Sequence, residues 1–269
     1  ASRWVPACST IRHQNRLKPS FLKTNCLCIS IPGTPKKGPA SAGQWEANYG
    51  EYAVGGESFQ VPDGLGIYLP PGGYMGFQMH YTPYGKEAVD NSKIGFYFYP
   101  KGETPEKIMR HTVIADNFIE LPPETDQHKE IAYLTFPKEA LLYSVFLHTH
   151  YRGEAGSLDM ITPDGKRTPL INLPRYDFNW QLMYRYAEPR TFKAGTTLKF
   201  SATFDNSSGN PANPDPQATV RWGEQTYDEM LLGYVEYFVP TARDGEPTSD
   251  VDSLRLALSR DRDLRLFSM

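Results

Sequence analysis

The sequence predicts an all-β fold of antiparallel, jelly-roll-like β-sandwiches. Three observations predict it. The 269-residue chain is rich in turn formers and aromatic residues, with 23 Pro, 22 Gly, 17 Tyr and 14 Phe, and these residue types favour many short strands over helices. Apolar segments recur between turn signals every ~8–12 residues, which is the pattern of antiparallel sandwiches. The length suits one large all-β domain or two small ones.

Charge, hydropathy and cysteine content exclude several classes of function. The net charge of −3, from 28 basic and 31 acidic residues, gives no electrostatic basis for binding nucleic acid or an anionic membrane. No apolar run approaches the ~20 residues that cross a bilayer. No signal peptide is visible, which leaves two readings open: a cytoplasmic protein, or a chain supplied without its true start. Cys26 and Cys28 have only one residue between them, a spacing that favours neither a zinc knuckle nor an ordinary disulfide, and a bridge from Cys8 is the alternative.

The first part of the chain changes character near residue 41. Ala1 to about Ala40 has no strand or helix period and includes the linker-like PGTPKKGP. Strands are predicted at Gly66–Leu69, Tyr74–Tyr81 and Ile94–Tyr99. On the second of these, His80 lies on the more polar face because side chains alternate along a strand.

The second part carries the clearer strand patterns. Strands are predicted at Ile131–Phe136, Leu141–His148, Tyr176–Tyr186, Thr196–Phe204 and Met230–Val239. The Asp-Gly turn of Pro163–Lys166 predicts a hairpin between the flanking segments. DNSSGNPANPDP, residues 205–216, is predicted as a loop, and a short helix is predicted at Val251–Leu266.

The stretch LLYSVFLHTHYRG, residues 141–153, contains a candidate metal site. On a strand, His148 and His150 project from the same face, with Thr149 pointing away. Two imidazoles on one rigid element can chelate a single metal ion. Met230 opens the last predicted strand and can supply a third ligand if that strand neighbours the His148 strand. Two imidazoles and a thioether suit copper that cycles between Cu(I) and Cu(II), whereas Met230 as a plain core residue is the structural alternative.

Four motifs together resemble one enzyme family. They are FLHTHYRG, PRYDFNWQ from Pro174, FDNSSGNPANPDP from Phe204 and VRWGEQTYDEM from Val220. In combination they resemble the C-terminal domain of the copper type II, ascorbate-dependent monooxygenases, and most of all its bacterial members. The similarity spans about Phe59 to Pro240. It implies a partial N-terminal β domain at residues 41–100, a complete C-terminal sandwich at residues 101–241 and a polar tail at residues 242–269, with residues 1–40 unassigned.

The resemblance also implies metal ligands. The oxygen-activating copper of the family falls on His148, His150 and Met230. FQMHYTP resembles the stretch that supplies one histidine of the family's second, electron-transfer copper, and His80 takes that role. The family's adjacent His-His pair for that copper has no counterpart, since His13 is the only histidine before His80. Either residues are missing upstream or supplied by a partner domain, or the protein keeps one copper.

The implied reaction is hydroxylation of a substrate C–H bond with O₂, with ascorbate or another reductant as electron donor. Tyr234 matches a tyrosine that helps to hold substrate in the peptide-hydroxylating member. Phe146 stands where that member has a carboxylate-binding arginine, so a glycine-extended peptide is not expected as the substrate, which can be a small molecule or another peptide. The family implies an extracytoplasmic location. No separate cofactor-binding residues are assigned.

The alternative function is a non-catalytic copper-binding protein or a vestigial jelly-roll binding module, which the absent His-His pair favours. Two further histidines, His111 and His128, are expected to face solvent because neither lies in a ligand motif. Asp and Asn of the 205–216 loop are expected to form turns rather than a Ca²⁺ site. Asp228 and Glu229 are expected to position the start of the Met230 strand.

Overall fold

The structure is a computed structural model, and it describes residues 3–5, 8–9, 27–32, 45–52, 59–69, 76–79, 85–87, 89, 96–100 and 102–240. Every regular element within these residues is a β-strand, which confirms the predicted all-β class. In this part of the chain no helix has the length and apolar character needed to cross a membrane. The helix predicted at Val251–Leu266 lies outside the described residues.

The chain divides into two compact units. One consists of Ala1–His111 with Phe238–Pro247, and the other of Thr112–Tyr237 with Thr248–Met269. Strands β8 and β17 therefore contribute residues to both units. The four-part domain division implied by the family resemblance stays a prediction.

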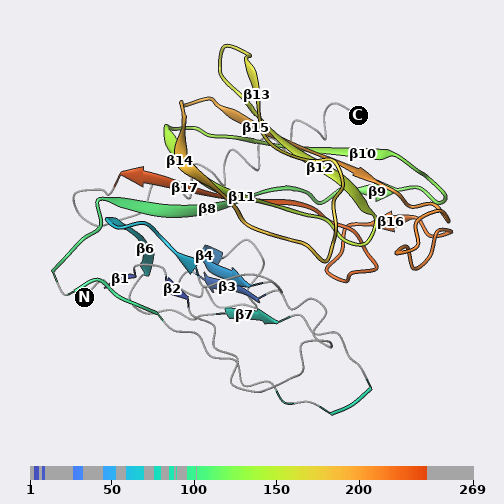
Figure 1. The fold of residues 1–269 in the computed structure, drawn as a ribbon, viewed down its shortest axis with the longest axis horizontal. Helices are drawn as coiled ribbons and strands as arrows, with labels where there is room; N and C mark the ends of the chain where they lie inside the picture. Colours follow the sequence, from blue (N-terminus) through green and yellow to red (C-terminus); the bar gives the residue numbers. More distant parts are fainter. Residues whose placement is uncertain are drawn as a thin grey trace. The chain divides into compact units, whose positions relative to one another are not determined.

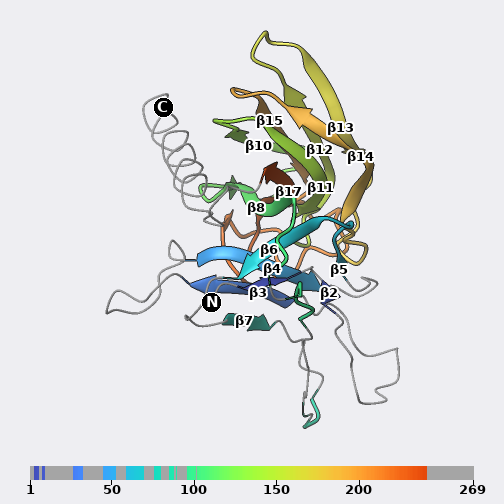
Figure 2. The ribbon, with the colours of Figure 1, turned by 90° about the vertical axis from the view of Figure 1, so that its left-hand side faces the viewer.

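The first unit contains short strands. They are β1 (Arg3–Val5), β2 (Cys8–Ser9), β3 (Leu27–Pro32), β4 (Trp45–Tyr52), β5 (Phe59–Gln60), β6 (Leu65–Leu69) and β7 (Gly76–Met79). β3 lies between β4 and β7 with antiparallel pairing on both sides (Figure 2). β6 pairs antiparallel with β1 and parallel with the start of β8. The short parallel pair departs from the purely antiparallel arrangement that the sequence predicted.

The second unit is built from two layers of strands (Figure 1). One layer has the order β8 (Lys107–Asp116), β17 (Leu231–Pro240), β11 (Ala140–His148) and β14 (Tyr184–Phe192). The other has the order β10 (His128–Thr135), β15 (Thr197–Phe204), β12 (Gly153–Ile161) and β13 (Arg167–Leu173). A small antiparallel pair joins β9 (Glu120–Leu121) to β16 (Val220–Arg221).

The core of the second unit lies between these layers. Phe136 packs edge-on against Phe192, with ring centroids 5.0 Å apart, and against Tyr237 at 5.1 Å. A Cβ added at Gly233 of β17 would lie 3.3 Å from Phe200 of β15, so the layers are in close contact there. Because side chains alternate along β17, Gly233 faces this core and Tyr234 faces the opposite side. The same alternation places Phe146 and His148 on the side of β11 away from Leu147, which contacts β12 at Gly156.

The strand predictions differ from the structure at several places, and β1, β2 and β3 lie within residues 1–40, where the sequence pattern predicted no strand. The hairpin around Gly165 is confirmed, as β12 and β13 pair antiparallel and Gly165 has φ of 84°. Phe96–Tyr99, within a predicted strand, have no regular structure. β14 begins at Tyr184 rather than Tyr176, because the preceding residues form a loop. β8 was not predicted, since charged residues interrupt its apolar pattern.

Candidate metal centre

The two histidines of the His-x-His pair lie at the end of β11. His148 is its last residue and is half-buried, whereas His150 follows the strand and is 3% exposed. Their rings are 5.1 Å apart between centroids and nearly perpendicular, at 83°. A tight turn follows, in which Gly153 N–H donates to the His150 carbonyl. A Cβ at position 153 would lie 1.8 Å from the Thr149 hydroxyl oxygen, so only glycine fits this turn.

Hydrogen bonds decide which nitrogen of His148 carries the proton. The Gln181 amide donates from Nε2 to the Phe178 carbonyl at 2.7 Å, which orients its Oε1 toward the imidazole. His148 Nδ1 lies 2.6 Å from this Oε1. An amide oxygen only accepts hydrogen bonds, so His148 carries its proton on Nδ1 and presents Nε2 as the nitrogen with a lone pair.

His150 is held in the same tautomer by a different partner. Its Nδ1 lies 3.2 Å from the backbone carbonyl oxygen of Asp228, which also only accepts. Both imidazoles therefore direct protonated Nδ1 atoms at carbonyl oxygens and keep lone pairs on Nε2. Metal-ligating histidines characteristically donate their other ring nitrogen to a carbonyl or carboxylate in this way, so the pair fits a metal centre.

Met230 lies immediately before β17, which neighbours β11 in the sheet. The condition on which its role as a third ligand depended is thus met. Its backbone N–H donates to Glu229 Oε2 at 2.9 Å, and the same oxygen accepts the His150 N–H at 2.5 Å. In the described part of the chain, His, Cys, Asp and Glu form no group of three that could hold a metal. The Met230 thioether is the candidate third ligand for a centre on His148 and His150.

Glu229 joins the two segments of the candidate centre. The carboxylate is fully buried and accepts a third backbone N–H, from Arg152 to Oε1 at 2.9 Å. Burial raises the pKa of Glu229 to about 7, while the three N–H donors and Arg152 oppose that rise. The sequence predicted that Glu229 positions the start of the Met230 strand, which corresponds to its contact with the Met230 N–H. Its contacts with His150 and Arg152 were not predicted.

Aromatic rings surround the histidines. The Phe146 ring stacks on the His148 ring, with centroids 6.2 Å apart. The Tyr234 ring contacts Phe146 edge-on, with centroids 5.6 Å apart. Tyr234, Phe146 and His148 thus form one row on the same face of the sheet. On the other side, the Phe178 ring meets His150 edge-on at 6.2 Å.

The loop between β13 and β14 holds the His-x-His segment through three residues. Tyr176 donates its hydroxyl to the Thr149 carbonyl at 2.9 Å and accepts the Thr149 N–H at 3.2 Å. Burial raises the pKa of Tyr176, so the phenol remains a donor. Together with Phe178 and Gln181 it fixes the histidines from outside the strand. The PRYDFNWQ motif contains all three residues, but its sequence assigned them no site role.

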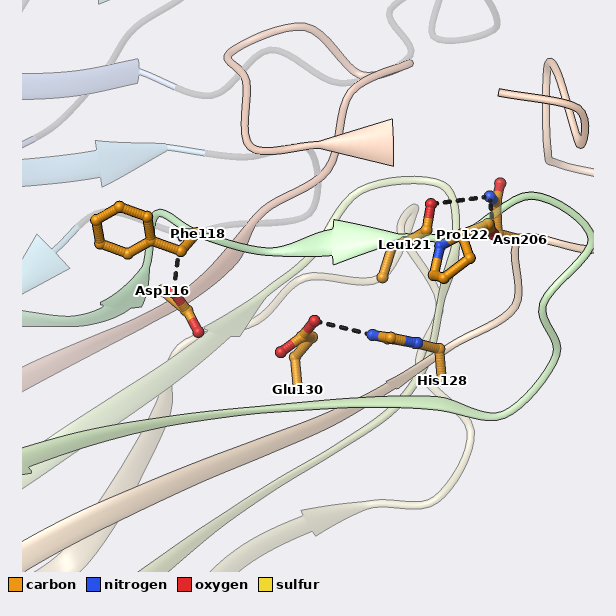
Figure 3. Close-up of polar contacts among 7 residues, drawn as sticks. All are labelled: Asp116, Phe118, Leu121, Pro122, His128, Glu130 and Asn206. Atoms are coloured by element: carbon orange, nitrogen blue, oxygen red, sulfur yellow. Dashed lines mark hydrogen bonds and ion pairs between the residues drawn. The ribbon is translucent and has the colours of Figure 1, made fainter. Parts of the chain in front are cut away.

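A buried arginine and a buried asparagine support the candidate centre from behind. Arg152 donates from Nε to Asn206 Oδ1 at 2.7 Å and from its guanidinium to the Tyr227 carbonyl at 2.8 Å. Asn206 Nδ2 in turn donates to the Pro122 and Ala218 carbonyls at 2.7 and 3.0 Å, and more weakly to Leu121 (Figure 3). Asn206 thus ties the 205–216 loop to β9 and β16. Neighbouring Asp205 and Asp215 accept backbone N–H groups two residues ahead, as turn formers do.

The remaining histidines lie apart from this centre or outside the description. His80 lies outside the described residues, so its role at an electron-transfer copper stays a prediction. The expectation that His111 faces solvent is wrong: the side chain is half-buried with its Nε2 atom buried, and burial lowers the pKa of the imidazole to about 4. Its position in β8, which was not predicted as a strand, explains the error. His128 is half-buried, and its Nε2 lies 2.8 Å from Glu130 Oε1 (Figure 3).

A protein-family model matches residues 108–253, just over half of the chain. The model describes the copper type II ascorbate-dependent monooxygenase C-terminal domain. The chain belongs to this monooxygenase family. The match covers every described residue of the candidate centre, from Phe146 to Tyr234, and it includes the loops that hold the histidines.

Solved structures with some likeness are capsid proteins of infectious bursal disease virus. The Gt strain structure is 10% identical with a TM-score of 0.25, and the match covers 90% of this chain and 56% of that one. The VP2 subviral particle is 11% identical with a TM-score of 0.25, covering 89% of this chain and 58% of that one. The chain thus spans less than two thirds of these proteins, and at these scores the likeness carries no inference about fold or function.

Proposed function

We propose that this protein is a copper-dependent monooxygenase whose oxygen-activating metal binds to His148 Nε2, His150 Nε2 and the Met230 thioether. One observation carries the proposal: both imidazoles direct Nδ1–H at carbonyl oxygens, of Gln181 and Asp228, and so keep Nε2 as the ligating nitrogen. Family membership supports copper as the metal. Imidazole accepts both Cu(I) and Cu(II), and soft sulfur stabilises Cu(I).

Copper bound there would supply O₂ activation and hydrogen abstraction from a substrate C–H bond, with electrons from a reductant such as ascorbate. The protein's own residues hold the ligands. Gln181 and Asp228 fix the imidazoles in one tautomer, and Glu229 holds the backbones of His150 and Met230. We further propose that His80 belongs to a second, electron-transferring copper and that the protein works in an extracytoplasmic compartment.

The proposed substrate presents an apolar C–H group to the metal. Phe146 and Tyr234 form an aromatic row that leads to His148, in which Phe146 is buried and half-buried Tyr234 is the more accessible ring. Such rings bind apolar or aromatic groups by burial and edge contacts, and the Tyr234 hydroxyl adds one polar contact. Position 146 holds Phe and not arginine, so a peptide's terminal carboxylate would find no cationic side chain there.

The first test is copper stoichiometry of the full chain by elemental analysis, with His148→Ala beside the wild type. We expect the variant to lose one copper per chain. His128→Ala is the matched control, because His128 is a half-buried histidine of the same unit whose ring contacts Glu130. Copper retained by His148→Ala, or lost equally from both variants, would remove the proposed centre.

A second measurement separates the enzyme from a non-catalytic copper protein. The absence of an adjacent His-His pair from this sequence favours the non-catalytic alternative, either a copper-binding protein without turnover or a vestigial jelly-roll binding module. Copper-loaded protein with ascorbate and an apolar C–H substrate is expected to consume O₂, and His148→Ala is expected to abolish the consumption above free-copper background. Stoichiometric copper with no such consumption favours the non-catalytic protein. If the wild type binds two coppers per chain and His80→Ala binds one, the proposed second copper at His80 is supported.

A further inference from the structure

A single carboxylate links the two chain segments that carry the proposed copper ligands. Glu229 Oε2 accepts the N–H groups of His150 at 2.5 Å and Met230 at 2.9 Å. Glu229 Oε1 accepts the Arg152 N–H at 2.9 Å. His150 and Met230 are distant in sequence, yet their backbones meet at one oxygen atom.

A carboxylate is suited to this position and an amide is not. Both oxygens of Glu229 accept hydrogen bonds, and the side chain is fully buried. Buried backbone N–H groups must be paired, and all three are paired here. Glutamine has one acceptor oxygen and one donor NH₂ group. In place of Glu229, its NH₂ would face a backbone N–H at the site of either Oε1 or Oε2, and two donors cannot pair.

The two proposed ligands depend on this clamp to different degrees. His150 has a second anchor, because its Nδ1 is held at the Asp228 carbonyl. A methionine side chain has three rotatable bonds and a thioether that is only a weak hydrogen-bond acceptor, so it has no counterpart of the anchor at His150 Nδ1, and its backbone is the part that Glu229 holds. Loosening the backbone at Met230 therefore displaces the thioether more than the imidazole.

On the basis of the proposed copper site, we infer that Glu229 is a positioning residue that holds the Met230 thioether at the metal and thereby sets the preference for Cu(I) over Cu(II). The thioether is the ligand that distinguishes the two oxidation states. Glu229 acts through Met230 and His150 and does not contact substrate in this role. Its removal should change the Cu(I) and Cu(II) affinities unequally, which general destabilisation does not do.

The test compares Glu229→Gln with Glu236→Gln in the full chain. Glu236 is a matched control, because it is also buried, its pKa is also raised to about 7 by burial, and it lies in β17. Its partner is the Ser144 hydroxyl rather than a backbone group of the centre. Cu(I) and Cu(II) affinities are measured by competition titration, Cu(I) without oxygen, and copper–sulfur coordination by X-ray absorption.

We expect Glu229→Gln to weaken Cu(I) at least tenfold more than Cu(II) and to lose the copper–sulfur signal, with both retained in Glu236→Gln. In a Met230→Leu background, Glu229→Gln should no longer change the Cu(I)/Cu(II) ratio. Equal weakening of both states, or an intact sulfur signal, would overturn the inference. If Glu229→Gln fails to fold by circular dichroism, Glu229→Asp, which keeps both oxygens on a shorter side chain, is judged by the same criteria. Wild-type protein without copper–sulfur coordination would instead refute the proposed site itself.

Discussion

At the scale of single residues, amide and carbonyl oxygens determine how the histidines present themselves. Gln181 is oriented by the Phe178 carbonyl and in turn orients His148. Neither contact involves a charged partner, so the His148 ring is oriented by neutral hydrogen-bond acceptors and not by an ion pair. The imidazoles are prepared for a metal before one binds, which lowers the cost of ordering them on binding.

Replacing Gln181 should therefore weaken metal binding without removing a ligand. Gln181→Leu takes away the acceptor for His148 Nδ1–H, and the loss of such an outer partner commonly costs roughly 10–100-fold in metal affinity. Competition titration with Cu(II) measures the change. Asn179→Ala, two residues earlier in the same loop and exposed, is the control and should bind as the wild type does. Equal affinity of Gln181→Leu and wild type would show that the loop does not prepare His148.

A second buried carboxyl makes stability depend on pH. Burial raises the pKa of Glu236 from 4.5 to about 7, against the Ser144 hydrogen bond and nearby Arg185 of β14. Tyr143 of β11 also interacts with this carboxyl. Because the folded-state pKa is the higher one, the stabilising contribution is complete below about pH 4.5 and is lost as the pH rises to about 7.

Glu236→Gln should remove this dependence, since glutamine does not titrate. The free energy of unfolding of the variant relative to wild type should increase between pH 4.5 and 7 by up to about 3 kcal/mol, which corresponds to the rise of the Glu236 pKa from 4.5 to about 7. Urea unfolding of both proteins at pH 5 and pH 8 gives the difference. Other titrating groups are common to both proteins and cancel. An unfolding difference that stays constant across this range contradicts the raised pKa.

At the scale of elements, sequence patterns predict regular strands and hairpins well and predict the loops around the centre poorly. β15 alternates buried and half-buried residues along its length, as the pattern TTLKFSATF predicts. The aromatic run from Tyr176 reads as a strand, but Tyr176 and Phe178 instead turn toward the histidines. Alternation of apolar residues indicates which side chains are buried, but not whether a strand or a loop buries them. Here the rings of Tyr176 and Phe178 belong to a loop that packs on the histidines.

The candidate centre was predictable only in part for the same reason. His148, His150 and Met230 stand out through residue type and family resemblance. Strand patterns permit β11 and β17 to be neighbours, as they are in the sheet, but do not determine it. The contacts of Glu229 with His150 and Arg152 span about eighty residues. No spacing rule connects such positions, so they emerge only from the folded unit.

One buried amide ties the loop at residues 205–216 to the rest of the second unit. Asn206 accepts from Arg152 and Asn213 and donates to carbonyls flanking β9 and β16. Asn206→Ala leaves these buried groups unpaired and should cost roughly 3 kcal/mol in the free energy of unfolding. Urea denaturation measures it, with exposed Asn172→Ala of β13 as a control expected to change stability by less than about 0.5 kcal/mol. Equal stability of the two variants would mean that the loop holds without Asn206.

At the scale of the whole molecule, the centre exists only when the second unit is folded. His150 and Met230 converge through strands β11 and β17, and their supports come from loops on either side. The unfolded chain has no such arrangement, so a metal that binds here binds the native state and stabilises it by mass action.

Copper should therefore raise the thermal stability of the chain, by an amount that grows with the logarithm of the ratio of free copper to its dissociation constant. Free Cu(I) at a hundredfold excess over its dissociation constant stabilises by roughly 2.7 kcal/mol, which raises the Tm of a unit of this size by roughly 5–10 °C. Differential scanning calorimetry without oxygen, with and without Cu(I), measures the shift. His148→Ala should abolish it and Met230→Leu should reduce it, whereas His128→Ala should leave it unchanged because His128 contacts Glu130 instead. A shift of the same size in all four proteins would place the stabilising copper elsewhere in the chain.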